Sequence, residues 1–221
     1  MLGHILSSDM IIKSEFNGSP HIGVFCLLND HVAFVPYSTS PEFEHLLKAE
    51  FGVSVVRATL AGTSLLGIFA CINNSKIIVS DIIEKGEIKV LEEHVSEVVQ
   101  LSEKYTALGN LISLNDHGAV CSRYIKSVEE IPAARIKVAE SDLVGSAVYS
   151  NNHGFLAHRD ASQKELEEIQ SVLKVKGDIG TLNFGDPLVK SGIIGNKRGV
   201  IVGKYTSGPE MQRVDEVFML K

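Results

Sequence analysis

Apolar and polar positions follow one pattern that occurs five times along this chain. In each copy, two short apolar runs bracket a polar turn that contains Asn, which is typical of a β-hairpin. In four copies a Ser follows 11 or 12 residues after the turn, where a helix would begin. Repetition at a spacing of roughly 40 residues indicates a repeat architecture. The five turns are Asn29-Asp30, Asn73-Asn74, Asn115-Asp116, Asn151-Asn152 and Asn196-Lys197.

The fourth copy shows the expected elements most clearly. Residues 147–150 and 155–158 are the predicted strands of its hairpin. The run Ser162-Gln163-Lys164-Glu165 has the form of a capping box, in which both side chains satisfy free backbone N–H groups at a helix start. Apolar residues then recur at helical spacing over 166–173, and a further strand is expected within 175–184. Each unit is therefore predicted to run strand, turn, strand, helix, strand.

The other copies carry related helix signals. In Ser40-Pro41, the Pro stands at the first helical position, where its missing N–H costs nothing. The S-x-x-E form returns at residues 127–130 and 207–210. The second copy departs from this form, because Glu84-Lys85-Gly86 replaces the capped start, and its helix is expected from Glu87 to His94.

Four copies end in a Gly that is followed by a polar residue. We expect these polar residues to occupy equivalent loops on one rim, since loops on a rigid scaffold are where recognition commonly sits. Turn geometry alone would also select such residues. The four pairs are Gly62-Thr63, Gly109-Asn110, Gly145-Ser146 and Gly185-Asp186.

Five such units could stack in a line or close into a ring. A line needs polar capping repeats at both ends, and neither end has one. Both ends instead read as strands, at residues 11–16 and 217–220. Pairing these segments would remove two exposed sheet edges, so we predict a closed α/β ring. Residues 1–9 are interpreted as an N-terminal extension and 10–221 as one domain, with repeats at approximately 19–62, 63–109, 110–145, 146–185 and 186–220.

Several short motifs stand in a characteristic order along the chain: Gly23-Val24-Phe25, residues 58–62, Ala107-Leu108-Gly109-Asn110, Asn115-Asp116, Leu143-Val144-Gly145-Ser146, residues 150–154 and residues 180–185. In this order the chain resembles the translation initiation factor 6 family, the ribosome anti-association factors of archaea and eukaryotes. The resemblance covers about residues 10–220. It implies the family's fold, a five-bladed α/β propeller with pseudo-fivefold symmetry called the pentein fold. The chain stops after its last expected strand, without the tail typical of eukaryotic members, so archaeal members are the expected relatives.

The resemblance also implies a function. Members of the family bind the intersubunit face of the large ribosomal subunit and block its joining to the small subunit. A monomeric, cytoplasmic protein without enzymatic activity is expected, with a ribosomal protein as its main partner and an adjacent rRNA loop as a second one. No cofactor, metal, membrane or small-molecule substrate is expected. The candidate ribosome-binding residues are Asn110, Leu188, Asn183, Thr63 and Ser146.

Charge and apolar length exclude several other classes. The chain has 21 Lys and Arg against 27 Asp and Glu, a formal net charge of −6. A protein that bound nucleic acid mainly by neutralising phosphates would need the opposite sign. The longest apolar stretch, residues 65–72, is far too short to span a bilayer. No P-loop or G-x-G-x-x-G motif is present, so a nucleotide-binding enzyme is not indicated.

Pentein folds also include enzymes, and the alternative function is a hydrolase or amidinotransferase acting on guanidino compounds. Those enzymes use a Cys nucleophile near the C-terminal end, with a His and acidic residues in the central cavity. Here no Cys follows Cys121, and Cys26 and Cys71 lie within apolar runs. We therefore expect three buried structural thiols, with neither a disulfide framework nor a zinc site.

Three histidines, His31, His117 and His153, lie in or beside equivalent hairpin turns. Such turns favour polar residues that tolerate positive φ, whatever their function. On one rim of a ring these side chains would lie too far apart to share a metal ion. We expect them to be structural or solvated.

Overall fold

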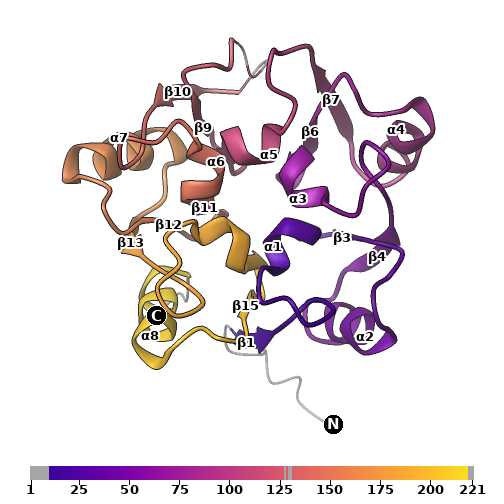
Figure 1. Ribbon diagram of the computed structural model, residues 1–221, viewed down its shortest axis with the longest axis horizontal. Coiled ribbons are helices and arrows are strands. Elements are labelled where there is room, and N and C mark those ends of the chain that lie inside the picture. The colour runs from indigo at the N-terminus through magenta and orange to yellow at the C-terminus, as the bar shows by residue number, and fades with distance from the viewer. Residues whose placement is uncertain (1–9, 127, 129–130, 219–221) are drawn as a thin grey trace, which may run out of the picture.

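Five three-stranded sheets surround a central axis as the blades of a propeller (Figure 1). The computed structural model describes residues 10–126, 128 and 131–218. Each blade begins with a one-turn helix near the axis. An antiparallel hairpin follows, and a third strand then pairs in parallel with the second. The five-bladed architecture expected from the repeats and from the resemblance is confirmed.

Blades 1 and 2 contain all parts of the unit. Blade 1 comprises α1 (Ile22–Phe25), β2 (Leu27–Leu28), β3 (Val32–Val35), α2 (Pro41–Ala49) and β4 (Ser54–Arg57). Blade 2 comprises α3 (Leu66–Phe69), β5 (Ala70–Ile72), β6 (Lys76–Ser80), α4 (Lys85–Glu92) and β7 (Glu97–Leu101). The hydrophobic pattern did not predict the one-turn helices α1 and α3, because a run of four mainly apolar residues is equally typical of a strand.

The other three blades vary this plan. Blade 3 comprises α5 (Leu108–Leu111), β8 (Ile112–Leu114), β9 (Ala119–Ser122) and β10 (Ala133–Ile136). Blade 4 comprises α6 (Val144–Ala147), β11 (Val148–Ser150), β12 (Phe155–His158), α7 (Gln163–Leu173) and β13 (Gly177–Gly180). Blade 5 comprises the 3-10 helix η1 (Val189–Gly192), β14 (Ile193–Asn196), β15 (Gly199–Gly203), α8 (Gly208–Phe218) and β1 (Met10–Ser14).

The first strand of the chain completes the last blade. β1 pairs in parallel with β15, from Met10 beside Gly199 to Ser14 beside Gly203. The prediction of a closing strand at residues 217–220 is wrong, because Val217 and Phe218 are the last residues of α8. Val214 and Phe218 are both buried one helical turn apart, which is the spacing of a helix face. Residues 1–9 and 219–221 lie outside the described residues.

Capping residues set the starts of the outer helices. The Ser40 hydroxyl accepts a hydrogen bond from the Phe43 N–H (3.2 Å), and Ser162 and Glu165 form the predicted capping box. The predicted start of α4 at Glu87 is wrong: the helix begins at Lys85, and the Glu87 carboxylate accepts from the Glu84 N–H (3.1 Å). A Glu three positions after the cap therefore works without the Ser. Of the predicted box at 127–130, all but Val128 lies outside the described residues.

Apolar packing between neighbouring blades forms the core. The second strands are buried on both sides, since each lies between two other blades. Phe34 of β3, for example, belongs to the same buried cluster as Ile77 and Val79 of β6. Two-sided burial explains why these strands are continuously apolar instead of alternating.

Candidate interaction face and central channel

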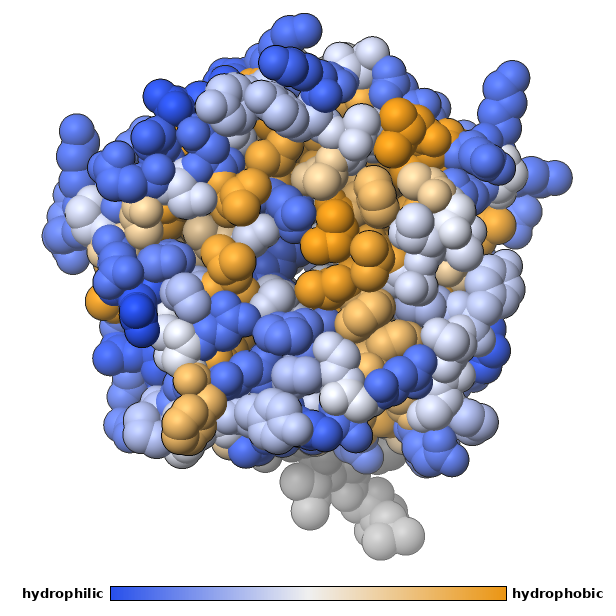
Figure 2. All heavy atoms as spheres, in the orientation of Figure 1, coloured by the Kyte–Doolittle hydropathy of each residue, from blue (hydrophilic) through white to orange (hydrophobic). Residues whose placement is uncertain are grey.

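The order of elements gives the ring two different faces. In every blade the hairpin turn lies at one end of the strands, and the short helix lies at the other. We call these the hairpin face and the short-helix face; the short-helix face points toward the viewer in Figures 1 and 2. The second and third strands are parallel to each other and antiparallel to the first, so both end at the short-helix face.

Exposed large apolar side chains gather on the short-helix face. In the part of the chain that the structure describes, each of them follows a second or third strand, and none lies in a hairpin turn. Apolar surface also borders the central opening over α1 and α3 (Figure 2). Contiguous exposed apolar surface commonly marks an interaction site. The exposed residues are Tyr37, Ile82, Tyr105, Tyr124, Leu143, Phe184, Leu188 and Tyr205.

Asn110 and Ser146 occupy equivalent positions on α5 and α6, and these two helices pack together. The Ser146 hydroxyl donates to Oδ1 of Asn110 at 3.0 Å. Both residues are partly exposed on the short-helix face. The two predicted residues therefore belong to one pair that links blades 3 and 4.

Thr63 and Asp186 lie elsewhere, in tight turns that precede the short helices. The Thr63 hydroxyl donates to the Leu60 carbonyl (3.0 Å), and Asp186 accepts from the Leu188 N–H (2.9 Å). The prediction of four equivalent loops is therefore wrong. The prediction failed because these glycines have two different structural roles. Gly62 provides positive φ in a turn (φ +68°), whereas the glycines of the short helices allow close helix packing.

Leu188 and Asn183 differ in how they meet solvent. Leu188 directly precedes η1, as Leu143 precedes α6, and both side chains are exposed. The Asn183 side chain turns inward, and its amide donates to the Pro20 carbonyl at 3.1 Å. Asn183 therefore connects blade 5 to the segment that enters blade 1. Its part in partner binding stays a prediction.

Phe184, next to Asn183, was not among the predicted binding residues. Its side chain is 84% exposed, more than any other large apolar side chain in the described ranges. The signal in the sequence was weak: an aromatic residue at a turn position where related turns have Gly18 or Gly62.

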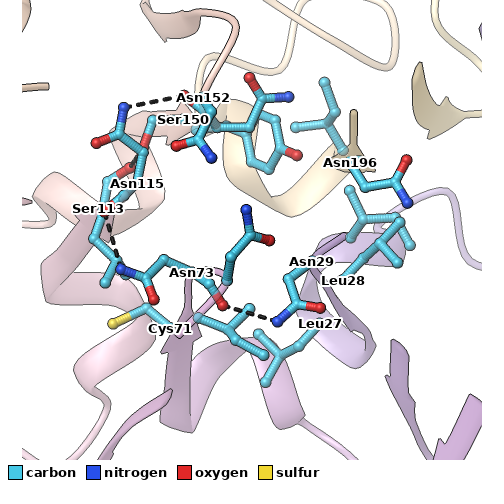
Figure 3. A pocket seen from close by; sticks show the side chains of 18 of the residues that line it. Leu27, Leu28, Asn29, Cys71, Asn73, Ser113, Asn115, Ser150, Asn152 and Asn196 are labelled. Carbon is cyan, nitrogen blue, oxygen red and sulfur yellow. Dashed lines mark hydrogen bonds between the residues drawn. The ribbon is translucent and has the colours of Figure 1, made fainter. Parts of the chain in front are cut away.

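The repeated Asn residues join the blades at the hairpin face (Figure 3). Within its own turn, Oδ1 of Asn115 accepts from the backbone N–H groups of His117 (3.0 Å) and Gly118 (3.1 Å). The amide groups reach the next blade: Asn29 donates to the Asn73 carbonyl (2.8 Å), and Asn73 donates to the Asn115 carbonyl (3.1 Å). The motif that revealed the repeat is thus a connector between blades.

The second residues of the turns add a belt of hydrogen bonds. The Asp30 N–H donates to the Asn74 side chain (2.9 Å), and the Asn74 N–H donates to the Asp116 carboxylate (2.9 Å). The Lys197 N–H donates back to Asp30 (2.7 Å), which carries the belt across the seam between blades 5 and 1. The carboxylates of Asp30 and Asp116 are therefore already used as acceptors.

A channel along the axis is lined by all five blades and encloses a cavity of about 80 Å³. Lys190 of η1 reaches into it, and its ammonium donates to the carbonyls of Gly67 (3.0 Å) and Gly109 (2.5 Å). Burial lowers the pKa of Lys190 to about 8. Lys190 stands at the position that Gly occupies in the other short helices.

The glycines of the short helices are required by close contact. A Cβ on Gly67 would lie 1.9 Å from the Gly23 carbonyl oxygen, and a Cβ on Gly109 would lie 2.1 Å from the Gly67 oxygen. The Gly145 position is equally tight against Gly109 (2.4 Å). These backbone contacts fix the inner ring of helices and hence the shape of the short-helix face.

The thiols are buried, as predicted, and two of them line the channel. Burial raises the pKa of Cys71 to about 12 and that of Cys121 to about 11, and it raises the pKa of Cys26 still further. A thiol with such a pKa stays protonated at neutral pH and is a poor nucleophile.

Metal-ion sites and membrane-spanning helices each require a particular arrangement of residues. His31, His117 and His153 each lie in the turn of a separate blade. Residues 10–126, 128 and 131–218 contain no group of three His, Cys, Asp or Glu side chains placed to hold a metal ion. Across the same residues, no helix has the length and apolarity needed to cross a membrane.

Comparisons with known proteins agree with this architecture. The family model described as the eIF-6 family matches residues 11–217. Translation initiation factor 6 of Haloquadratum walsbyi is 34% identical over 215 residues, which are 93% of this chain and 95% of the relative. Translation initiation factor 6 of Methanosphaerula palustris is 33% identical over 217 residues, which are 95% of this chain and 98% of the relative.

Among solved structures, a DDAH from Pseudomonas aeruginosa complexed with citrulline superposes with a TM-score of 0.45 at 14% identity, over 90% of this chain and 74% of that one. This likeness is too weak to bear on activity. The sequence relatives are decisive, because they cover nearly the whole chain. The chain belongs to the eIF-6 family, whose archaeal relatives found here are named translation initiation factor 6.

Proposed function

We propose that this protein binds the large ribosomal subunit on its intersubunit face and thereby prevents the small subunit from joining. The observation that carries the proposal is the gathering of exposed apolar side chains on the short-helix face, in a member of a translation-factor family. The mechanism is steric. A rigid disc occupies a surface that the small subunit needs, and no chemical step is required.

The binding surface is proposed to be the short-helix face, with a ribosomal protein as the main contact and an adjacent rRNA loop as the lesser one. Asn110, Ser146 and Leu188 all lie on this face and are partly accessible. The hairpin face is polar, and its turns are occupied in joining the blades. We propose that the protein acts as a cytoplasmic monomer without a cofactor.

An enzymatic role on guanidino compounds has less support. The channel is lined by Cys71, His153 and Asp30, which are the residue types such an enzyme uses. However, burial keeps the Cys71 thiol protonated, and Asp30 accepts hydrogen bonds from the neighbouring turns. The Lys190 side chain also reaches into the channel, where its ammonium donates to the Gly67 carbonyl.

Sedimentation in sucrose gradients tests the proposal. The protein is mixed with purified archaeal large subunits, small subunits, or both, at subunit-joining concentrations of Mg²⁺. We expect it to co-sediment with large subunits alone and to reduce the peak of joined ribosomes. Equal binding to both subunits, or to neither, would sink the proposal. Binding to the large subunit without loss of joined ribosomes would refute the anti-association role.

A further inference from the structure

The turn that enters blade 5 differs from its equivalents. The turns entering blades 1, 2 and 4 have two central residues with positive φ, one of which is Gly18, Gly62 or Glu140. The turn from Leu182 to Asp186 is one residue longer. At the position equivalent to those three residues it carries Phe184, with φ +68°.

Positive φ is uncommon for residues other than Gly, Asn and Asp, and for a bulky side chain it is an outlier. The surrounding structure holds this conformation firmly. The Glu210 carboxylate accepts from the backbone N–H groups of Phe184 (3.1 Å) and Gly185 (2.8 Å). The same carboxylate accepts from the Ser207 N–H (2.7 Å) at the start of α8. The turn is thereby fixed to the end of a long helix.

This clamp does not require an aromatic residue. Glu87 holds the turn entering blade 2 through the N–H groups of Ala61 and Gly62, both at 3.0 Å. Glu165 holds the turn entering blade 4 through the Ala139 N–H (3.1 Å). Neither turn presents a large apolar side chain. Phe184 therefore adds nothing that the turn needs, although its strained backbone and its 84% exposure both cost free energy.

The chemistry of the neighbourhood identifies the kind of partner. A Phe side chain offers apolar contact and no hydrogen-bond donor or acceptor. Leu188 and Leu143 are exposed on the same face, at the starts of the packed helices η1 and α6. Five basic side chains on this face are paired with carboxylates, which leaves less positive charge free to bind a phosphate backbone. These pairs are Arg57–Glu44, Arg123–Asp142, Lys137–Glu140, Arg159–Asp160 and Lys204–Glu15.

We propose that Phe184 is an anchor residue, which the Glu210 clamp holds ready to insert into an apolar pocket on a protein surface. This inference rests on the proposed binding to the large subunit and names the side chain that dominates it. The clamp fixes the backbone that carries Phe184, so the turn loses little conformational freedom on binding. Buried aromatic anchors of this kind supply much of the affinity of protein interfaces.

The test uses the full-length protein with Phe184→Gly. Gly adopts positive φ without strain, so the melting temperature is expected to stay the same or to rise. Binding to purified archaeal large subunits is expected to weaken at least about tenfold. The matched control is Tyr37→Ala, which removes a 61% exposed aromatic from blade 1 of the same face and should leave binding within about twofold. If Phe184 had a purely structural role, its replacement would not weaken binding without also lowering the melting temperature.

Other outcomes separate this inference from the proposed function. If the wild type binds large subunits and Phe184→Gly binds equally well, the anchor is refuted and the proposed function stands. If the wild type binds neither subunit, both are refuted. Protein-free rRNA of the large subunit is the second probe. If it binds the wild type and loses affinity for Phe184→Gly, Phe184 stacks on RNA, and the protein pocket is refuted.

Discussion

The Ser146 hydroxyl donates a 3.0 Å hydrogen bond to Oδ1 of Asn110, across the contact between α6 and α5. This bond joins two blades at the surface that we assign to partner binding. A side chain so placed contributes to stability and to recognition at once. Experiments on this face must therefore separate the two effects.

Replacing Asn110 and Leu188 together by Ala is expected to weaken binding to large subunits. The loss of the Asn110–Ser146 bond should also cost about 1 kcal/mol of stability. Ser146→Ala is the matched control, since it removes the same bond and keeps the Asn110 side chain. We expect chemical denaturation to show a similar loss of stability for the control, and sedimentation to show a smaller loss of binding than for the double variant. If the double variant binds large subunits as tightly as the wild type, the interface lies on another surface.

Gly67→Ala is expected to destabilise the protein severely, by about 3 kcal/mol or more, because its Cβ would lie 1.9 Å from the backbone oxygen of Gly23. Gly86→Ala in α4 is the control, because a Cβ there meets no atom within 4 Å. The control should raise stability by about 0.5–1 kcal/mol, since Ala is the better helix former. Urea denaturation measures both. Equal stability of the two variants would contradict the requirement for close contact.

Lys190 should make stability rise with pH above about 8. Burial lowers its folded-state pKa from the ordinary 10.5 to about 8. Between these values the unfolded chain binds the proton and the folded protein does not, so the free energy of unfolding increases with pH. Below about pH 8 both states are protonated, and this group contributes no slope.

Lys190→Met is the comparison for this effect. The difference in unfolding free energy between the wild type and the variant should change in favour of the wild type from pH 8 to pH 10. Subtraction removes the contributions of groups that both proteins share. A difference that is constant over this range would show that Lys190 stays charged in the folded protein.

Glu210→Gln is expected to destabilise the protein by about 1–3 kcal/mol, because one oxygen that accepts backbone N–H bonds becomes a donor. Burial alone would raise the pKa of Glu210, but the hydrogen bonds from Ser207, Thr181 and Gly185 hold it below its ordinary value. The stability that it provides is present above the ordinary pKa and is lost as pH falls through the folded pKa. The variant should therefore lose less stability in acid. Glu92 on α4 is exposed, so Glu92→Gln should leave stability at neutral pH nearly unchanged.

The three thiols should resist an aromatic disulfide reagent at pH 8 in the folded protein. Their pKa values are raised by burial, and their side chains are inaccessible. All three should react once the chain is unfolded in urea. Rapid reaction of a single thiol in the folded state would instead revive the enzymatic alternative.

The fold followed from the sequence because its repeated signals are local. An Asn turn fixes a hairpin, and a Ser or Glu cap fixes a helix start, whatever the rest of the chain does. The end of the chain was misread for the same reason: residues 217–218 look like a strand when taken alone. Only the spacing back to Val214 shows them to be one side of a helix.

The site was harder to predict because its residues are defined by their neighbours in space. Gly62 and Gly109 look alike in sequence, yet one provides positive φ and the other makes room for the backbone of the next blade. Asn183 looked like a surface residue, but its amide is bound inside. Phe184 stands out as a binding candidate only when its turn is compared with the equivalent turns of the other blades. Those turns could be aligned only after the short helices were known.

Met10 of β1 lies beside Gly199 of β15. The first strand of the fold therefore has no pairing partner until the last strand has been synthesised. During synthesis, β1 leaves the ribosome long before β15 exists. The ring can therefore close only when the whole chain is present, and a truncated product would keep an open seam between blades 5 and 1. A closed ring is thus a sign that the chain has been synthesised to its last blade.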